Sequence, residues 1–176
     1  MSIRSIIIAA LATITAAGLT AAANAGDDPV ARGKYLVTVM GCGDCHTPGY
    51  FFGKPDMSRM LAGSEVGFQM PGLGVFYGPN LTSDKETGLG NWSAEDIVKA
   101  IQTGERPDGR MLAPIMPWPN LAHLTPEDAK AIAAFLKSLP PVKNKAPGPF
   151  GVGETPTAFV MMVVPGDKGT APPAPK

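Results

Sequence analysis

Two cysteines and one histidine lie within a single short stretch of the chain, Gly41-Cys42-Gly43-Asp44-Cys45-His46-Thr47. In a C-x-x-C-H run the two thiols share one short turn, and each can form a thioether with a vinyl group of haem. The histidine after the second thiol then lies beneath the iron as an axial ligand. The stretch therefore predicts one covalently attached c-type haem, with its iron, held by Cys42, Cys45 and His46.

Other uses of a cysteine pair fit this sequence less well. A structural zinc site needs four Cys or His ligands, and the only histidine besides His46 is His123. A thioredoxin-like pair follows a strand within a βαβ pattern, but the residues before Cys42 predict a helix. A disulfide between Cys42 and Cys45 would be strained and would leave His46 without a role. A binding module without haem is thus the disfavoured alternative.

Met116 is the favoured second axial ligand among the methionines of the chain. It stands in Ala113-Pro-Ile-Met-Pro-Trp-Pro119, where the prolines restrict φ and stiffen the loop. A stiff loop can hold a thioether against iron at a small cost in entropy, and Met/His ligation is typical of electron-transfer haems. His123 is the rival ligand, although its place just before a helix cap favours a solvated loop. An iron left open for a small molecule, as in a haem enzyme or gas sensor, is the further alternative.

The first residues of the chain have the features of an export signal. Arg4 precedes an apolar or small stretch over 5–23, and Ala23-Asn-Ala25 offers a cleavage site. We therefore predict a signal peptide over residues 1–25, cleavage after Ala25 and a periplasmic location. The alternative is an uncleaved membrane anchor, because the stretch approaches the length that spans a bilayer.

Charge and length restrict the remaining possibilities. Fifteen basic and 15 acidic residues give a net charge of zero, which argues against binding to nucleic acid. The length predicts one domain, which we place at residues 26–140, followed by a Pro/Gly-rich extension over 141–176.

The end of that extension, residues 171–176, has a composition typical of disorder. Residues 158–164 are apolar but too few to span a membrane, so we expect a strand-like segment docked on the body or a contact for a partner protein.

Three helices follow from caps and apolar spacing. The first begins at Asp28 with Pro29 next, and continues toward Gly41. The second has Ser93 and Asp96 as a capping box and ends at Gly104. The third begins at Thr125, with Asp128 expected to complete a second box, and ends before Pro140. Since no alternating strand pattern is convincing in this part of the chain, the sequence predicts an all-α core.

A long segment between His46 and Trp92 is rich in Gly, Pro and aromatic residues. Loops of this length in a compact domain are ordered by something else or are functional. Its aromatic residues either pack on the haem or form a separate hydrophobic cluster: Phe51, Phe52, Phe68, Phe76 and Tyr77.

From Arg32 to Leu139 the chain resembles the bacterial class I c-type cytochromes, in particular the single-haem modules of periplasmic dehydrogenase subunits. The segments that carry the resemblance are Cys42–His46, Gly78–Ser93 and Asp108–Asp128. It implies an all-α fold of helices and long ordered loops around one haem, with Met116 as the distal ligand. It also implies that the Pro79 carbonyl accepts a hydrogen bond from His46 Nδ1, and that Arg110, Trp92 and Trp118 contact the haem edge or propionates.

The chain departs from this family pattern on its first helix. Many members have an aromatic residue four positions after a glycine, whereas Gly33 is followed at that distance by Val37. Phe135 is the residue that can supply an aromatic ring from the last helix instead.

The expected function is electron transfer rather than catalysis. The resemblance implies single-electron exchange with redox partner proteins, either a periplasmic dehydrogenase or a terminal oxidase. The sequence leaves open whether the chain is a free shuttle or a bound subunit.

Overall fold

The computed structural model describes residues 28–164, so the predicted export signal and residues 171–176 lie outside the described part. The elements in chain order are helix α2 (Pro29–Val39), helix α3 (Cys42–His46), the 3₁₀ turns η1 (Tyr50–Phe52) and η2 (Met57–Arg59), strands β1 (Val66–Met70) and β2 (Gly74–Tyr77), helices α4 (Ala94–Thr103), α5 (Trp118–Leu121) and α6 (Pro126–Ser138), and strand β3 (Phe159–Met161).

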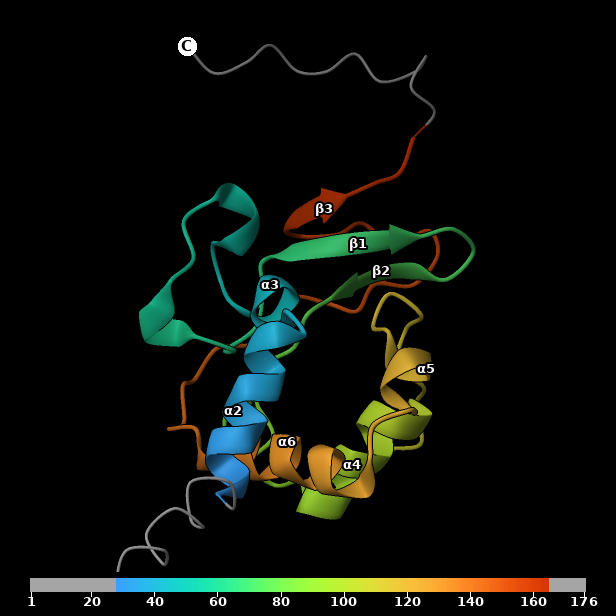
Figure 1. The fold of residues 1–176 in the computed structure, drawn as a ribbon. Helices are drawn as coiled ribbons and strands as arrows, with labels where there is room; N and C mark the ends of the chain where they lie inside the picture. Colours follow the sequence, from blue (N-terminus) through green and yellow to red (C-terminus); the bar gives the residue numbers. More distant parts are fainter. Residues whose placement is uncertain (1–27, 165–176) are drawn as a thin grey trace, which may run out of the picture.

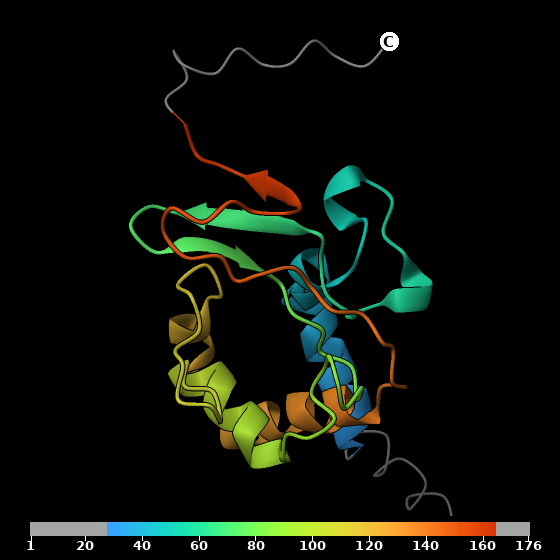
Figure 2. The same cartoon turned by 180° about the vertical axis from the view of Figure 1, so that it is seen from behind.

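The elements are arranged around a common centre (Figure 1). Helices α2, α6 and α4 lie on one side, and the small sheet lies on the opposite side. Helix α3 joins α2 to the sheet side, while α5 lies across from α2 and α3. The view from behind shows the same arrangement (Figure 2). No helix in the stretch 28–164 is both long and apolar enough to cross a membrane.

The three long helices begin where their caps predict. The Asp28 side chain accepts from the Val30 amide at 2.9 Å. Ser93 and Asp96 form the expected reciprocal capping box of α4. Such side-chain oxygens satisfy backbone amides that have no partner in the first helical turn.

The second capping box, expected at Thr125 and Asp128, is only half formed. The Thr125 hydroxyl accepts from the Asp128 amide at 3.1 Å, as predicted. The Asp128 carboxylate instead accepts from Arg32 Nε at 2.8 Å, and so joins α6 to α2. A charged partner on the neighbouring helix therefore replaces the local backbone amide.

The hydrophobic core is helical, as the sequence predicts. Helix α2 supplies Leu36 and Val37, α4 supplies Ile97, and α6 supplies the largest share. The buried residues of α6 in this core are Ala131, Ile132, Ala133, Phe135 and Leu136.

Gly33 allows α2 and α6 to approach closely. A Cβ added there would lie 1.9 Å from the Ala131 carbonyl oxygen and 2.8 Å from Phe135 Cβ. Phe135 is buried beside this contact, so an aromatic residue of the last helix does pack against the glycine of the first.

The expectation of an all-α fold is incomplete, because the structure also contains a three-stranded sheet with strand order β2-β1-β3. Strands β1 and β2 are antiparallel, with Phe68 opposite Phe76, and β3 pairs parallel to β1. The sheet was missed because β1 is short and contains Gly67, which weakens both strand propensity and the alternating pattern. The Tyr77 ring packs over Gly67, where an added Cβ would lie 2.6 Å from a ring carbon.

The segment after α6 packs on the body as far as β3. Phe150 forms a β-bridge with Val75, and the Tyr77 hydroxyl donates to the Ala158 carbonyl at 3.4 Å. The strand expected within residues 158–164 is therefore present as β3.

The aromatic residues of the long loop pair with one another and with this later segment. Phe51 meets Phe68 edge-to-face at 5.4 Å between ring centroids, and Phe52 meets Phe159 at 4.9 Å. Tyr77 similarly meets Phe150 at 6.0 Å. Of the two alternatives, these contacts favour a hydrophobic cluster around the sheet.

Replacing Gly33 with Ala is expected to destabilise the fold. The new methyl group would meet backbone on α6, which cannot move without separating the helices, so we expect a loss of about 2–3 kcal/mol in the free energy of unfolding. Denaturant unfolding followed by circular dichroism measures it. Lys34→Ala, at an exposed position of the same helix, is the control and should change stability by less than about 0.5 kcal/mol; equal stabilities for the two variants would contradict the close-contact argument.

Candidate functional site

Helix α3 presents the two thiols and the imidazole on one face. Cys42, Cys45 and His46 occupy positions i, i+3 and i+4 of this single helical turn, and such positions are neighbours on a helix surface. The turn is entered through Gly41, whose φ of 66° is left-handed and therefore suited to a residue without Cβ. The expected grouping of these three side chains is thus present.

Both cysteines are unpaired thiols that are partly shielded from solvent. Burial raises the pKa of Cys42 to about 11 and also raises the pKa of Cys45. Redox-active C-x-x-C pairs have a lowered thiol pKa instead. In addition, α3 follows helix α2 rather than a strand, which argues further against a thioredoxin-like site.

His46 is held in one orientation beneath this turn. Its side chain is almost fully buried, with 6% of its surface exposed, and its Nδ1 lies 2.8 Å from the Pro79 carbonyl oxygen. Because a carbonyl only accepts, Nδ1 carries the proton and Nε2 keeps its lone pair. Burial lowers the pKa of His46, although the bond to Pro79 opposes this shift. The hydrogen bond implied by the family resemblance is therefore confirmed, and the neutral ring is a ready metal ligand.

Two neighbouring segments hold the backbone around His46. The Gly63 amide donates to the His46 carbonyl at 2.8 Å, and the Ser64 amide donates to the Gly78 carbonyl at 2.9 Å. At Gly78 the chain passes so close to α3 that an added Cβ would lie 1.8 Å from the Cys45 carbonyl oxygen. Only glycine permits this approach, which brings the following Pro79 carbonyl to the imidazole.

Met116 lies in the loop that leads into α5. That loop is fixed locally: the Leu112 amide donates to the Gly104 carbonyl at 2.7 Å, and the Met116 amide donates to the Ala113 carbonyl at 2.9 Å. The Met116 side chain is half-buried. Both ribbon views place the start of α5 across the molecule from α3 (Figures 1 and 2).

The rival ligand is on the surface, and each residue expected at the haem edge contacts another part of the protein. His123 is exposed, and Arg110 pairs with Asp108 on the surface. The Arg106 guanidinium lies over the Trp92 ring at 5.2 Å. Trp118 packs against Gly104.

The residues present fit a c-type haem. Paired thiols and a neutral imidazole are the groups that would attach this haem and ligate its iron. Trp118 Nε1 is buried without a hydrogen-bond partner among residues 28–164, and a buried indole N–H normally has an acceptor. Pro79, which bonds to His46, and Ile115, which precedes Met116, are exposed apolar residues, as expected of surface that a bound macrocycle covers.

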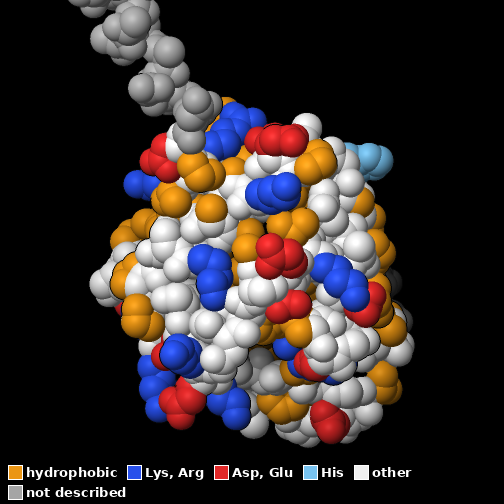
Figure 3. Space-filling view, turned by 90° about the horizontal axis from the view of Figure 1, so that it is seen from below, with side chains coloured by type: hydrophobic (Ala, Val, Ile, Leu, Met, Phe, Trp, Pro, Cys, Tyr) orange, Lys and Arg blue, Asp and Glu red, His pale blue; other side chains and the backbone are white. Residues whose placement is uncertain are grey.

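The charged side chains show no single-sign surface on the face seen from below (Figure 3). Lysine and arginine alternate there with aspartate and glutamate, in agreement with the net charge of zero. This face therefore offers local contacts rather than strong electrostatic steering.

Sequence reasoning missed the residues that support His46 from a distance. Gly63 and Ser64 carry no motif, and Asn80 and Thr82 lie in a segment whose pattern is weak by itself. Asn80 and Thr82 are polar yet almost completely buried, which the sequence alone does not reveal.

Curated relatives share this region of the chain. The chain is 36% identical over 133 residues to the cytochrome c subunit of a quinone-type alcohol dehydrogenase from Gluconobacter oxydans, covering 74% of this chain and 26% of that one. It is 34% identical over 140 residues to the gluconate 2-dehydrogenase cytochrome c subunit of Pantoea cypripedii, covering 79% and 30% respectively. A diheme cytochrome c-type protein of Cereibacter sphaeroides is 40% identical over 117 residues, or 64% and 36% of the two chains. The chain thus spans about a quarter to a third of the length of these relatives.

A family model agrees with these relatives. The model described as cytochrome c matches residues 30–140, which include the α3 turn, the Pro79 carbonyl and Met116. The match covers more than half of the chain. With its thiols and buried imidazole in one turn, this chain belongs to the cytochrome c family, whose members transfer electrons through covalently bound haem c.

Proposed function

We propose that this chain carries single electrons in the periplasm on one haem, which is attached through Cys42 and Cys45 and ligated by His46 and Met116. The observation that carries the proposal is the His46 side chain, which is buried beside both thiols with Nδ1 committed to Pro79. This arrangement leaves Nε2 as the donor atom. The stiff loop before α5 provides the thioether from the other side.

Each residue has a separate role in this proposal. Cys42 and Cys45 hold the group covalently, so that it stays in place in both oxidation states. The Pro79 carbonyl fixes the His46 tautomer and increases the basicity of the ligand. The haem supplies a one-electron couple whose potential depends on its axial ligands, hydrogen bonds and burial. With His46 and Met116 both holding the iron, oxygen and other small ligands would be excluded, and electrons would pass without a bond to substrate.

The partner proposed on the donor side is a dehydrogenase. The relatives are named as cytochrome subunits of alcohol and gluconate dehydrogenases, and an electron carrier of this kind receives electrons from such an enzyme. The proposed leader over residues 1–25 would place the exchange in the periplasm. A short encounter over a small area suits a carrier that must release its partner after each transfer.

Replacing each cysteine tests the attachment. Cys42→Ala and Cys45→Ala should each retain one thioether, and this shifts the α-band of the alkaline pyridine haemochrome to longer wavelength relative to the unmutated protein. The double variant should release its haem on acid-acetone extraction. Haem retained by the double variant, or an exported wild-type protein with no covalent haem, would overturn the attachment.

Replacing Met116 tests the distal ligand. Met116→Ala should abolish the weak far-red absorption of ferric His/Met haem and allow the ferrous protein to bind carbon monoxide, because the sixth position becomes open. His123→Ala is the matched control and should keep both properties of the unmutated protein. If His123→Ala loses the far-red band, or if the unmutated ferrous protein binds carbon monoxide rapidly, the His46/Met116 assignment is wrong.

A further inference from the structure

We propose that residues 142–144, here called the anchor segment, set the orientation of the axial His46 ring by holding the two loops that bond to it. The anchor segment follows α6 and lies beyond the region that the cytochrome c family model matches, residues 30–140. The proposal rests on the function proposed above, because it treats His46 as the ligand. It assigns a ligand-positioning role to residues that have no contact with the ligand themselves.

The first loop, residues 78–82, contains two buried polar side chains. Asn80 and Thr82 are 2% and 1% exposed. Asn80 Oδ1 accepts from the Thr82 amide at 2.9 Å and from the Thr82 hydroxyl at 2.8 Å. Asn80 Nδ2 donates to Thr87 Oγ1 at 2.9 Å. Asn80 thus closes the turn that immediately follows Pro79.

The anchor segment completes this network. Asn80 Nδ2 also donates to the Val142 carbonyl at 2.7 Å, and the Val142 amide donates to Thr82 Oγ1 at 3.2 Å. The Asn144 amide donates to Thr87 Oγ1 at 3.1 Å. Without the anchor segment, Asn80 Nδ2 would keep only its bond to Thr87, and Thr82 Oγ1 would lose the amide that donates to it. A buried group left without a partner is costly.

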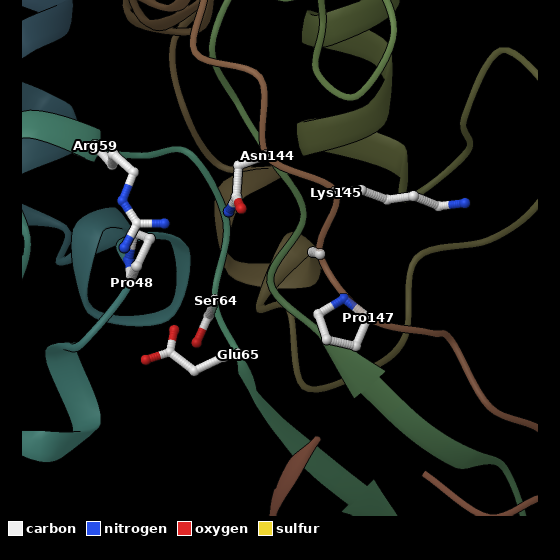
Figure 4. A pocket seen from close by; sticks show the side chains of 8 residues that line it. Pro48, Arg59, Ser64, Glu65, Asn144, Lys145 and Pro147 are labelled. Atoms are coloured by element: carbon white, nitrogen blue, oxygen red, sulfur yellow. The ribbon is translucent and has the colours of Figure 1, made fainter. Parts of the chain in front are cut away.

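Asn144 connects the anchor segment to the second loop as well. Its Nδ2 donates to the Ala62 carbonyl at 2.8 Å, and the next residue, Gly63, donates its amide to the His46 carbonyl. Figure 4 shows Asn144 beside the chain that carries Ser64, with Lys145 extending away from it. Asn144 and Ser64 line the same open pocket, which also includes Pro48, so Asn144 lies next to the second loop.

Both bonds to His46 are thus one residue away from a contact with the anchor segment. Pro79, which accepts from the ring, precedes Asn80. Gly63, which donates to the backbone, follows Ala62. A change in the anchor contacts would move or loosen the Pro79 carbonyl before it disturbed α3, since α3 has its own covalent and helical restraints.

The consequence concerns the electronic character of the ligand. A strong Nδ1–H bond to a carbonyl makes the imidazole a better donor and stabilises ferric iron, which lowers the reduction potential. If the anchor segment keeps this bond short, weakening its contacts should raise the potential and expose the Nδ1 proton to exchange with solvent.

The test uses the full-length haem protein and variants of the anchor contacts. Thr82→Val keeps the side-chain shape but removes the hydroxyl that binds Val142 and Asn80, whereas Thr82→Ser retains it. Asn144→Ala removes the bond to Ala62. Asn91→Ala is the matched control, because Asn91 donates its amide to another loop carbonyl, that of Lys85 at 2.8 Å, without a hydrogen bond to either His46 loop.

Two readouts decide the proposal: the potential, and the hydrogen-exchange rate of the His46 ring proton in the NMR spectrum of the reduced protein. We expect Thr82→Val and Asn144→Ala to raise the potential and to accelerate exchange at least about fivefold, while Thr82→Ser and Asn91→Ala keep wild-type values. Wild-type exchange and potential in Thr82→Val and Asn144→Ala would overturn the anchor proposal, as would equal shifts in Asn91→Ala. Failure of the proposed function would be seen before any variant is made, because the absorption spectrum of the wild-type protein would then lack the features of His/Met ligation. That outcome differs from failure of the anchor proposal, in which the wild-type spectrum is as expected and the variants behave like the wild type.

Discussion

The hydrogen bond from His46 Nδ1 to the Pro79 carbonyl is the interaction on which the site depends. It is 2.8 Å long and joins residues that are 33 positions apart. It selects the tautomer, leaves Nε2 free for a metal, and requires the chain at Gly78 to touch the carbonyl of Cys45. A side chain at position 78 would push the Pro79 carbonyl away from the ring, so the bond to His46 requires both the glycine and the proline.

The site combines one local and several distant restraints. The thiols and the imidazole are grouped by a single helical turn, which needs only the Cys42–His46 spacing and a left-handed Gly41. The support around this turn comes from loops that meet it from elsewhere in the chain. Leu61 has a left-handed φ of 62°, a strained value for a branched residue, and it is held by hydrogen bonds to Thr47 and Leu81. Distant contacts thus overcome an unfavourable local preference.

This division explains what the sequence predicts and what it does not. The start of a helix depends on contacts within one turn, and the structure has all three predicted starts, at Asp28, Ser93 and Thr125. The pairing of β3 with β1 and the role of Asn80 depend on partners far along the chain, at Phe159 and Val142, which periodicity cannot detect. The half-formed capping box of α6 follows the same rule, because Arg32 on α2 takes the carboxylate that local reasoning assigned to Thr125. The bond between His46 and Pro79 was expected only from the family resemblance, because local sequence patterns do not indicate a contact between residues 33 positions apart.

An electron carrier needs ligands that keep the same positions in both oxidation states, and here rigidity comes from polar contacts as well as from apolar packing. The hydrophobic core lies mainly between α2, α4 and α6 and includes Leu61. The loops around His46 are also joined by hydrogen bonds of the backbone and of buried side chains. Such bonds are directional and stronger where water is excluded, so they fix an angle better than an apolar contact does. The same exclusion makes a partly broken network costly. The loops at Ala62 and Asn80 should therefore hold or release the imidazole together, and the Pro79 bond should behave as a single cooperative restraint.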